Sequence, residues 1–462
     1  MHTDVLLITV DAWRVSHASF VPGSIDGCTP NLDAFAEGSA VFTEAVSHGP
    51  ATPYAFPALF SSTLPLDHGG YERIGTDRKP VSEVLSEDGF RCVGVHANPW
   101  LGERNGYARG YEEYRDVGEF GLPFFERARE LLLERFPLDH PVYRAAQGVY
   151  RHAQGPLRAV AGGGEDEMSV AREAVRAGRD WAESGGTSPT GTFTWMHLLE
   201  PHAPYVPPER HKRALGVDVG GDPTGLVTRA QRAPEELTER ERGALRGLYA
   251  ASVRHADERV GELLTHVPDD ALVIVTADHG EALGEHGQVG HEPALHDELV
   301  HVPLLIRPPG GTGTGRRIVD TQVEHIDVAP TILEYAAVAP PATYRGRSLR
   351  PAVEGGPIAE RIAISEVASH ASAPGRIDPD ALQVAARRPD RKLLLSGGGF
   401  TGFGLADDPG ETNPIDDPTG AGWTELRDAI DRRHAAIEFV ESADRGRDES
   451  THRRLRALGY VE

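Results

Sequence analysis

Two continuous apolar runs that end in acidic residues constrain this fold more than any other part of the chain. They are DVLLITVD at 4–11 and DALVIVTADHGE at 270–281. β-Branched runs without polar alternation are typical of strands buried on both faces of a parallel sheet. Ligands collect at the carboxyl edge of such a sheet. We therefore expect Asp11 and the pair Asp278–His279 to meet at one edge, although they lie far apart in the chain.

Further periodic segments extend this pair of strands into an α/β fold. Strands that alternate with helices indicate a large, mostly parallel sheet sandwiched by helices. The additional strands are predicted at 90–97, 192–199 and 301–307, and the helices at 30–38, 81–88, 124–135, 167–183 and 235–265. We predict a first domain at 1–355, with a helical insertion at 119–165 and a loop at 205–235, and a smaller C-terminal α+β subdomain at 356–462 with a small sheet and a terminal helix from about residue 423.

The composition narrows the range of partners. The chain has 462 residues and a formal net charge of −23, with 47 Lys and Arg against 70 Asp and Glu. This charge disfavours binding to nucleic acid or anionic membranes and is typical of proteins from high-salt environments, so we expect a halophilic, haloarchaeal source. No apolar run is long enough to span a membrane, and the start lacks a basic signal-peptide region, so a cytoplasmic location is expected. The 2 cysteines are expected to be ordinary buried thiols.

The predicted strand ends carry the ligands of a metal site. Two carboxylates and one imidazole at one edge provide a three-ligand site for one divalent cation. Mostly oxygen ligands with one nitrogen fit Ca²⁺, Mn²⁺ or Mg²⁺, with Zn²⁺ possible. Asp11 alone is as readily a helix cap or turn residue. A buried strand that ends in Asp278, His279, Gly280 and Glu281 favours the metal site.

A second candidate group lies in SHGPATPYAFPALFSS, at 47–62, where a helix begins. Thr52 precedes Pro53, which fits a helix N-cap followed by proline at the first helical position. The positive end of the same helix favours an anionic ester, and a metal that contacts the Thr52 oxygen would lower the pKa of its hydroxyl. The cap and the nucleophile compete for one oxygen, and the residues alone leave both open.

Several motifs, in order from residue 5 to about 414, resemble the sulfatase family of the alkaline phosphatase superfamily. They are LLITVDAWR, TPNLDAFAEGSAVFTEAVS, LEPHAPY, VTADHGEALGEHG, HDELVHVPLLIR, VEHIDVAPTIL, GRSL and LADDPGETNP. The resemblance implies an alkaline phosphatase-like sheet between helices, a C-terminal subdomain with a small sheet, and hydrolysis of small-molecule sulfate or phosphate-type esters. It does not indicate an oligomeric state.

The resemblance also implies roles for individual residues. Asp11, Asp278 and His279 match metal ligands, and Ala12 stands where sulfatases usually have a second Asp. His202 matches a histidine that contacts the ester oxygens or leaving group. His291 falls where many relatives have a substrate-binding Lys.

The family signature Cys (or Ser)-x-Pro-x-Arg is absent. The alignment puts Thr52 at the nucleophile position and Phe56 at that of the Arg. Thr cannot become formylglycine because its Cβ bears a methyl group, so the sulfatase elimination route is closed. The resemblance instead implies attack by a metal-activated Thr52, which would also be a metal ligand, and a covalent phospho- or sulfo-threonine. A single metal is expected because the motifs of two-metal relatives are missing.

Three further polar residues have open roles. Asn98 follows a predicted strand where relatives place substrate contacts, but it also precedes a proline and fits a turn. His286 is predicted to shape its loop or to reach the substrate. His197 is either a substrate group or a buried structural histidine. Two other functions compete with the hydrolase: a phosphoglycerol-type phosphoryl transferase and a catalytically degenerate binding protein.

Overall fold

The computed structural model describes residues 3–117, 190–311, 313, 315–369 and 377–439. Its main feature is a nine-stranded sheet in the order β10-β2-β9-β6-β1-β5-β3-β4, with β11 beside β2. The strands are β1 Val5–Val10, β2 Ala40–Val46, β3 Arg91–His96, β4 Glu113–Asp116, β5 Thr192–Leu198, β6 Leu272–Ala277, β9 His301–Arg307, β10 Arg317–Val319 and β11 Val323–Glu324.

The centre of the sheet is parallel, as predicted. β1 lies between β5 and β6 and runs parallel to both. All six residues of β1 and all six of β6 are buried, which explains their continuous apolar sequence. β9 runs antiparallel to β6 and to β2, so the sheet is mixed toward that edge. The five strands expected from the sequence are all present, and β2, β4, β10 and β11 are additional strands.

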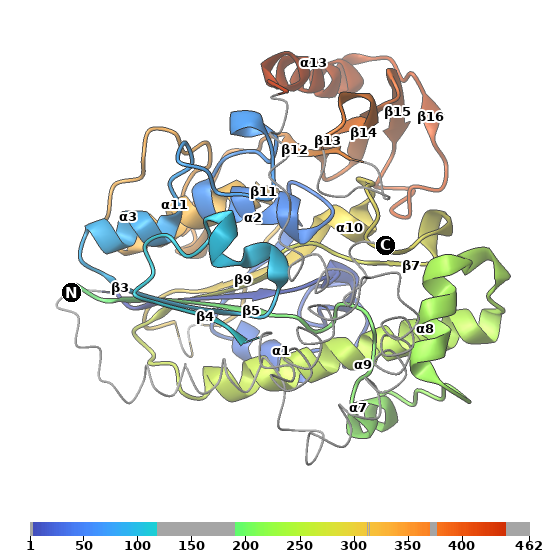
Figure 1. Cartoon of the computed structure of the whole chain (residues 1–462), viewed down its shortest axis with the longest axis horizontal. Coiled ribbons are helices and arrows are strands. Elements are labelled where there is room, and N and C mark those ends of the chain that lie inside the picture. Colours follow the sequence, from blue (N-terminus) through green and yellow to red (C-terminus); the bar gives the residue numbers. More distant parts are fainter. Residues whose placement is uncertain (1–2, 118–189, 312, 314, 370–376, 440–462) are drawn as a thin grey trace, which may run out of the picture.

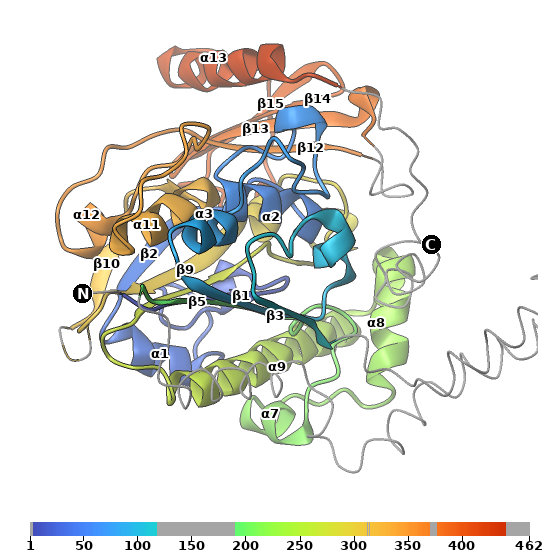
Figure 2. The same cartoon turned by 60° about the vertical axis from the view of Figure 1, so that its left-hand side comes forward.

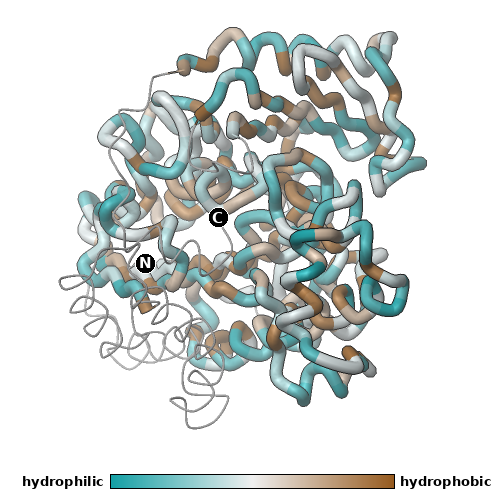
Figure 3. Tube along the Cα trace, turned by 45° about the vertical axis from the view of Figure 1, so that its right-hand side comes forward, coloured by the Kyte–Doolittle hydropathy of each residue, from teal (hydrophilic) through white to brown (hydrophobic). Residues whose placement is uncertain are grey.

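Helices cover both faces of the sheet. α1 and α9 lie on one face, and α2, α3 and α11 lie on the other (Figures 1 and 2). Hydrophobic segments lie mainly inside the molecule, and polar segments follow its outline (Figure 3). The helices are α1 Pro30–Ala36, α2 Thr52–Ser61, α3 Val81–Glu87, α7 Glu209–Ala214, α8 Pro223–Arg232, α9 Glu239–Leu264, α10 Asp297–Val300, α11 Val328–Tyr335, α12 Arg350–Val353 and α13 Ala421–Ala436.

A second sheet near the C-terminus is antiparallel and is covered by α13 (Figure 1). This confirms a C-terminal subdomain with a small sheet and a late helix. Its strands are β12 Ala363–Ala368, β13 Leu382–Arg388, β14 Arg391–Ser396, β15 Gly399–Phe403 and β16 Ile415–Asp416, and a separate hairpin pairs β7 Ala282–Leu283 with β8 Val289–Gly290.

One expectation is wrong in part. The segment 205–235 is not simply a loop, because it contains α7 and α8. Proline opens α8 at Pro223, and the Asp222 side chain accepts a hydrogen bond from Thr224 N, so residues typical of loops here begin a helix. The expected insertion at 119–165 and the helices at 124–135 and 167–183 lie outside the described residues. None of the helices in the described ranges has the length and apolarity needed to cross a membrane.

Candidate active site and metal centre

The predicted acidic residues meet at the carboxyl edge of the central strands. Asp11 follows β1, and Asp278 and His279 follow β6, which is the parallel neighbour of β1. All three side chains are fully buried. His279 Nε2 lies 3.4 Å from Asp11 Oδ1 and 3.6 Å from Asp278 Oδ2. The parallel pairing of β1 and β6 therefore brings Asp11, Asp278 and His279 into one cluster, although Asp11 lies far from the other two in the chain.

Thr52 joins this cluster through its hydroxyl group. Its Oγ1 donates to Asp278 Oδ2 at 3.0 Å and accepts from Asn98 Nδ2 at 3.0 Å. The N-cap of α2 is Ala51 rather than Thr52, and no side chain caps this helix end. Of the two roles that the sequence left open, the cap is therefore excluded, and the hydroxyl is directed to the buried carboxylate.

The helix that carries Thr52 is held by packing on all sides. All ten residues of α2 are buried, so the helix is apolar around its whole circumference apart from its small hydroxyls. Pro57 cannot donate to the carbonyl of Pro53, and Glu72 N donates to that oxygen instead, at 3.1 Å. Phe56, at the position aligned with the family Arg, meets the His197 ring edge-to-face at 5.1 Å. This position therefore packs an aromatic ring and provides no cation.

Asn98 is a turn residue, as considered, and its side-chain amide also reaches the cluster. Its Oδ1 accepts from Trp100 N at 3.0 Å and so caps a short 3-10 helix, Pro99–Leu101. Its Nδ2 donates to Asp11 Oδ2 at 2.8 Å and to Thr52 Oγ1 at 3.0 Å. The turn therefore fixes an amide that bridges the first carboxylate and the hydroxyl.

Ala12, the residue after Asp11, adds a backbone donor to the cluster. Its N–H donates to Asp278 Oδ1 at 3.2 Å, and its carbonyl accepts from Tyr249 Oη at 2.7 Å. Its φ of 57° is in the left-handed region, which costs a non-glycine residue about 1 kcal/mol or more. This strain lies at the site itself and aims the N–H at the carboxylate.

Two opposing effects set the pKa values in the cluster: burial disfavours the charged form of each group, and attraction between carboxylates and imidazoles favours it. Burial opposes the charged form of His279, but Asp278 and Asp11 outweigh it and raise the pKa of His279 to about 9. Burial also raises the pKa of Asp278, and the nearby Asp11 adds to this shift. For Asp11, burial is outweighed by the neighbouring histidines, chiefly His202, and its pKa lies well below the usual range. The ionisation of the two carboxylates is thus coupled to that of the neighbouring histidines.

His197 is a further member that the sequence analysis did not place at the metal. Its Nε2 lies 3.3 Å from Asp11 Oδ2, and ligand atoms of His197, Asp11 and Asp278 all lie within 4.8 Å of one another. The register of β1 and β5 places His197 at the site, because it sets His197 opposite Thr9 near the end of β1. The sequence alone does not give this register.

Hydrogen bonds orient His197 and His279 toward the carboxylates. Thr9 Oγ1 accepts a hydrogen bond from Trp195 Nε1 and donates its only hydrogen to Met196 O. In its contact with His197 Nδ1, at 3.0 Å, Thr9 Oγ1 is therefore the acceptor and Nδ1 is the donor. His279 Nδ1 likewise donates to Gly280 O at 2.7 Å. Both Nε2 atoms therefore face acidic oxygens, an approach that is repulsive unless a proton or a metal ion lies between them. This donor set fits a divalent cation.

His202 and His291 form a rim beside the cluster. The His291 ring centroid lies 4.6 Å from that of His279 and 4.9 Å from that of His202. Burial lowers the pKa of His202, although Asp11 opposes this shift. His286 has different neighbours: its ring stacks on His296 at 3.7 Å, and its Nε2 lies 3.5 Å from Glu298 Oε1. The structure thus brings His202 and His291 to the site and gives His286 contacts in the adjoining loop.

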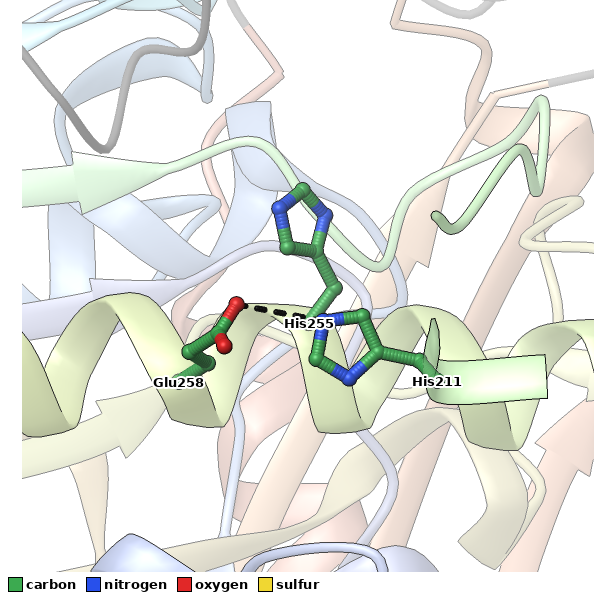
Figure 4. A group of neighbouring side chains, drawn as sticks. All are labelled: His211, His255 and Glu258. Atoms are coloured by element: carbon green, nitrogen blue, oxygen red, sulfur yellow. Dashed lines mark hydrogen bonds and ion pairs between the residues drawn. The ribbon is translucent and has the colours of Figure 1, made fainter. Parts of the chain in front are cut away.

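A second group of potential ligands has a structural explanation. His211 in α7 lies beside His255 and Glu258 in α9, and ligand atoms of the three lie within 4.8 Å (Figure 4). His211 Nε2 already contacts Glu258 Oε2 at 3.2 Å, and Arg210 pairs with the same carboxylate. The ring centroid of His255 lies 5.3 Å from that of His211. We assign this group to the docking of α7 on α9.

Comparison with known proteins identifies the family of the chain. The family model described as Sulfatase matches residues 3–338. The chain therefore belongs to the sulfatase family, whose members are ester hydrolases of the alkaline phosphatase superfamily.

Two solved structures share the fold along nearly the whole chain. Phosphonate monoester hydrolase of Agrobacterium radiobacter has a TM-score of 0.67 and 20% identity, and the match covers 94% of this chain and 95% of that one. A putative sulfatase from Bacteroides thetaiotaomicron has a TM-score of 0.65 and 17% identity, with 96% of each chain covered. At these identities the likeness concerns the fold.

Curated relatives match over different lengths. The multifunctional alkaline phosphatase superfamily protein PehA of Trinickia caryophylli is 27% identical over 75% of this chain and 76% of its own length. The uncharacterized sulfatase YidJ of Escherichia coli is 34% identical, but the match covers 22% of this chain and 21% of that protein. The chain therefore spans about a fifth of YidJ.

Proposed function

We propose that this protein hydrolyses small-molecule phosphate-type or sulfate esters, with Thr52 as the nucleophile and one divalent cation as cofactor. The observation that carries the proposal is the Thr52 hydroxyl, fixed 3.0 Å from Asp278 Oδ2 and 3.0 Å from Asn98 Nδ2. A buried hydroxyl needs a hydrogen-bond partner, and both partners of Thr52 are side chains at the cluster instead of backbone groups of the helix. Both contacts suit a hydroxyl that must lose its proton in one orientation.

The cation would be held by Asp11, Asp278 and His279, with Thr52 as a further ligand and His197 as a neighbouring candidate. Mn²⁺ and Zn²⁺ accept imidazole nitrogens together with carboxylate oxygens, whereas Ca²⁺ and Mg²⁺ prefer oxygen ligands alone. We therefore favour Mn²⁺ or Zn²⁺, with Ca²⁺ and Mg²⁺ as alternatives. When bound there, a divalent cation supplies a lowered hydroxyl pKa and polarisation of the ester oxygens.

The chain's own groups perform the remaining tasks. Asp278 Oδ2 accepts the Thr52 hydroxyl proton, and Asn98 Nδ2 holds the oxygen in place. Thr52 then attacks the phosphorus or sulfur atom, the leaving-group oxygen departs, and a phospho- or sulfo-threonine remains for hydrolysis by water. His202 and His291 face this region and contact the ester oxygens. The positive end of α2 favours the anionic group.

We favour phosphorus over sulfur at the centre of the ester. Thr52 cannot form the aldehyde on which formylglycine sulfatases rely, and Phe56 replaces the Arg of their signature. The structural relative named as a phosphonate monoester hydrolase supports this preference. The cytoplasmic location inferred from the sequence remains part of the proposal.

The test compares Thr52→Ala and Thr52→Ser on 4-nitrophenyl phosphate, phenylphosphonate, bis-phosphate and sulfate esters, with Mn²⁺ or Ca²⁺ in high salt. Thr52→Ala should lower kcat at least about 10³-fold, and Thr52→Ser should retain part of the activity because it keeps the hydroxyl. Thr228→Ala, an exposed hydroxyl in α8, is the control.

Mass spectrometry supplies a second readout. After an acid quench, the peptide that contains Thr52 should carry one added phosphoryl or sulfuryl group. Full activity of Thr52→Ala, or the added group on another residue, would contradict the proposal. Product release only in the presence of an acceptor alcohol would instead indicate a transferase.

A further inference from the structure

We propose that Glu281 is a positioning residue that holds His291 in one orientation toward the phosphoryl or sulfuryl group of the substrate. The inference rests on the proposed function and adds a residue to it. Glu281 Oε1 lies 3.0 Å from His291 Nδ1, and the Glu281 side chain is fully buried.

Glu281 differs from the other buried acidic residues in its partner. Outside the active-site cluster, the described chain has six other buried carboxylates, and five of them pair with Arg or Lys. The sixth, Asp257, accepts backbone N–H bonds at the start of α1. Glu281 forms no ion pair with Arg or Lys among the described residues. The five paired carboxylates are Asp67, Glu324, Asp327, Glu366 and Glu411.

Burial of a carboxylate without a cation is unfavourable for folding. A structural role would be expected to come with an Arg or Lys partner, as in five of the six other buried carboxylates, or with backbone N–H donors, as in Asp257. The partner present is instead an imidazole whose ring lies 4.6 Å from that of His279 and 4.9 Å from that of His202. The contact made by Glu281 is therefore directed at the site.

The backbone sets the two side chains beside each other. Glu281 directly precedes β7 and His291 directly follows β8, and these strands form an antiparallel hairpin in which Ala282 pairs with Gly290. Glu281 N also donates to Glu298 O at 2.9 Å. A Cβ on Gly280 would lie 2.0 Å from the same oxygen, so only glycine permits this close approach. The hairpin and the hydrogen bond to Glu298 O thus both fix the backbone that carries the Glu281 carboxylate.

This contact determines which nitrogen of His291 meets the substrate. A carboxylate oxygen only accepts hydrogen bonds here, so Nδ1 of His291 carries a proton, and Nε2 is the nitrogen directed to a ligand. An imidazole held at one nitrogen presents the other in a single orientation. For histidines that bind metals, loss of such a partner costs about 10–100-fold in affinity or activity, and we expect a loss of the same order for His291. We therefore expect Glu281 to act through His291 and not on the substrate directly.

A double-mutant cycle tests this coupling. Glu281→Leu and His291→Ala should each lower kcat/KM for the best nitrophenyl ester, and weaken binding of inorganic phosphate by calorimetry, by about 10–100-fold. The double variant should be no worse than His291→Ala, because the two residues act as one unit. Glu281→Gln retains an acceptor for Nδ1 and should stay within about threefold of the wild type.

Stability provides a control that a structural role would fail. Glu281→Leu should melt at the same temperature as the wild type or higher, because it removes a buried carboxylate that has no Arg or Lys partner among the described residues. Glu292→Gln, which changes an exposed carboxylate next to His291, is the matched variant and should leave both readouts unchanged.

The outcomes separate this inference from the proposed function. Additive losses in the double variant, or a loss in Glu281→Gln equal to that in Glu281→Leu, would overturn the role of Glu281 even if Thr52→Ala is inactive. Full activity of Thr52→Ala would overturn the proposed function instead. In that case the double-mutant cycle is read from the binding of inorganic phosphate alone. Coupled losses of phosphate affinity would support the role of Glu281, and additive losses would reject it.

Discussion

Asp278→Asn should have opposite effects on stability in the metal-free and metal-loaded protein. Asp278 Oδ2 lies 3.6 Å from His279 Nε2, and its ligand atom lies within 4.8 Å of that of Asp11. With an effective dielectric constant of about 20, the attraction is about 4.6 kcal/mol and the repulsion is at least about 3.5 kcal/mol. These interactions nearly cancel. The cost of burying the charge, several kcal/mol, then decides the sign.

Replacement by the neutral, isosteric Asn should therefore stabilise the metal-free protein by about 2 kcal/mol. Asn can still accept from Ala12 N and His279 N through its oxygen. With metal, the order reverses. A cation at 1,000 times its Kd stabilises the wild type by about 4 kcal/mol, whereas the variant lacks one anionic ligand and gains less.

The assay is thermal unfolding of EDTA-treated and Mn²⁺-saturated samples at the same salt concentration. Asp257→Asn is the control, because Asp257 is equally buried and bonds to the start of α1, away from the cluster. Its change in Tm should be the same with and without metal. A metal-free Asp278→Asn that melts below the wild type, or a Mn²⁺ shift equal to that of the wild type, would refute this account of the cluster.

The acidic strand ends could be predicted because their physical cause is local. A strand that must be buried on both faces excludes polar residues, so Asp11 and Asp278 stand out at the first position where polarity is allowed. Parallel pairing then forces their carboxyl ends to one edge. No further information about the fold was needed to bring these residues together.

His197 and Glu281 could not be assigned in the same way. His197 reaches the cluster through strand register, which depends on how β5 pairs with β1. Glu281 meets its partner through the turn of a short hairpin. In sequence both residues resemble ordinary buried polar groups, and only the pairing of distant backbone segments shows what they contact.

Thr52 shows a different limit of sequence reasoning. The Thr-Pro step fits a cap and a nucleophile equally well, because both need a hydroxyl at a helix start. The choice depends on a shift of one residue in the start of α2, which makes Ala51 the N-cap and turns the hydroxyl toward Asp278. Helix boundaries are the least certain part of a sequence-based assignment.

Two further predictions concern charges away from the site. Arg433→Met should destabilise the protein by about 3–5 kcal/mol in urea unfolding, because it removes the cationic partner of the buried Glu366. The control is Arg427→Met, in the same helix but paired with the exposed Asp417, which should cost less than about 1 kcal/mol. Equal losses in the two variants would contradict this reasoning. The second concerns His48, whose burial lowers its pKa to about 3. The unfolded chain, with an ordinary pKa near 6.5, binds more protons than the native state below that pH. His48 therefore reduces stability as pH falls from about 6.5 toward 3, by up to about 1.4 kcal/mol per pH unit, and has no such effect above pH 7. His48→Gln should flatten the dependence of unfolding free energy on pH between 6 and 4 by that slope, whereas replacement of the exposed His434 should leave it unchanged. An unchanged slope in His48→Gln would mean that His48 is already protonated in the native state at these pH values, against the burial that lowers its pKa.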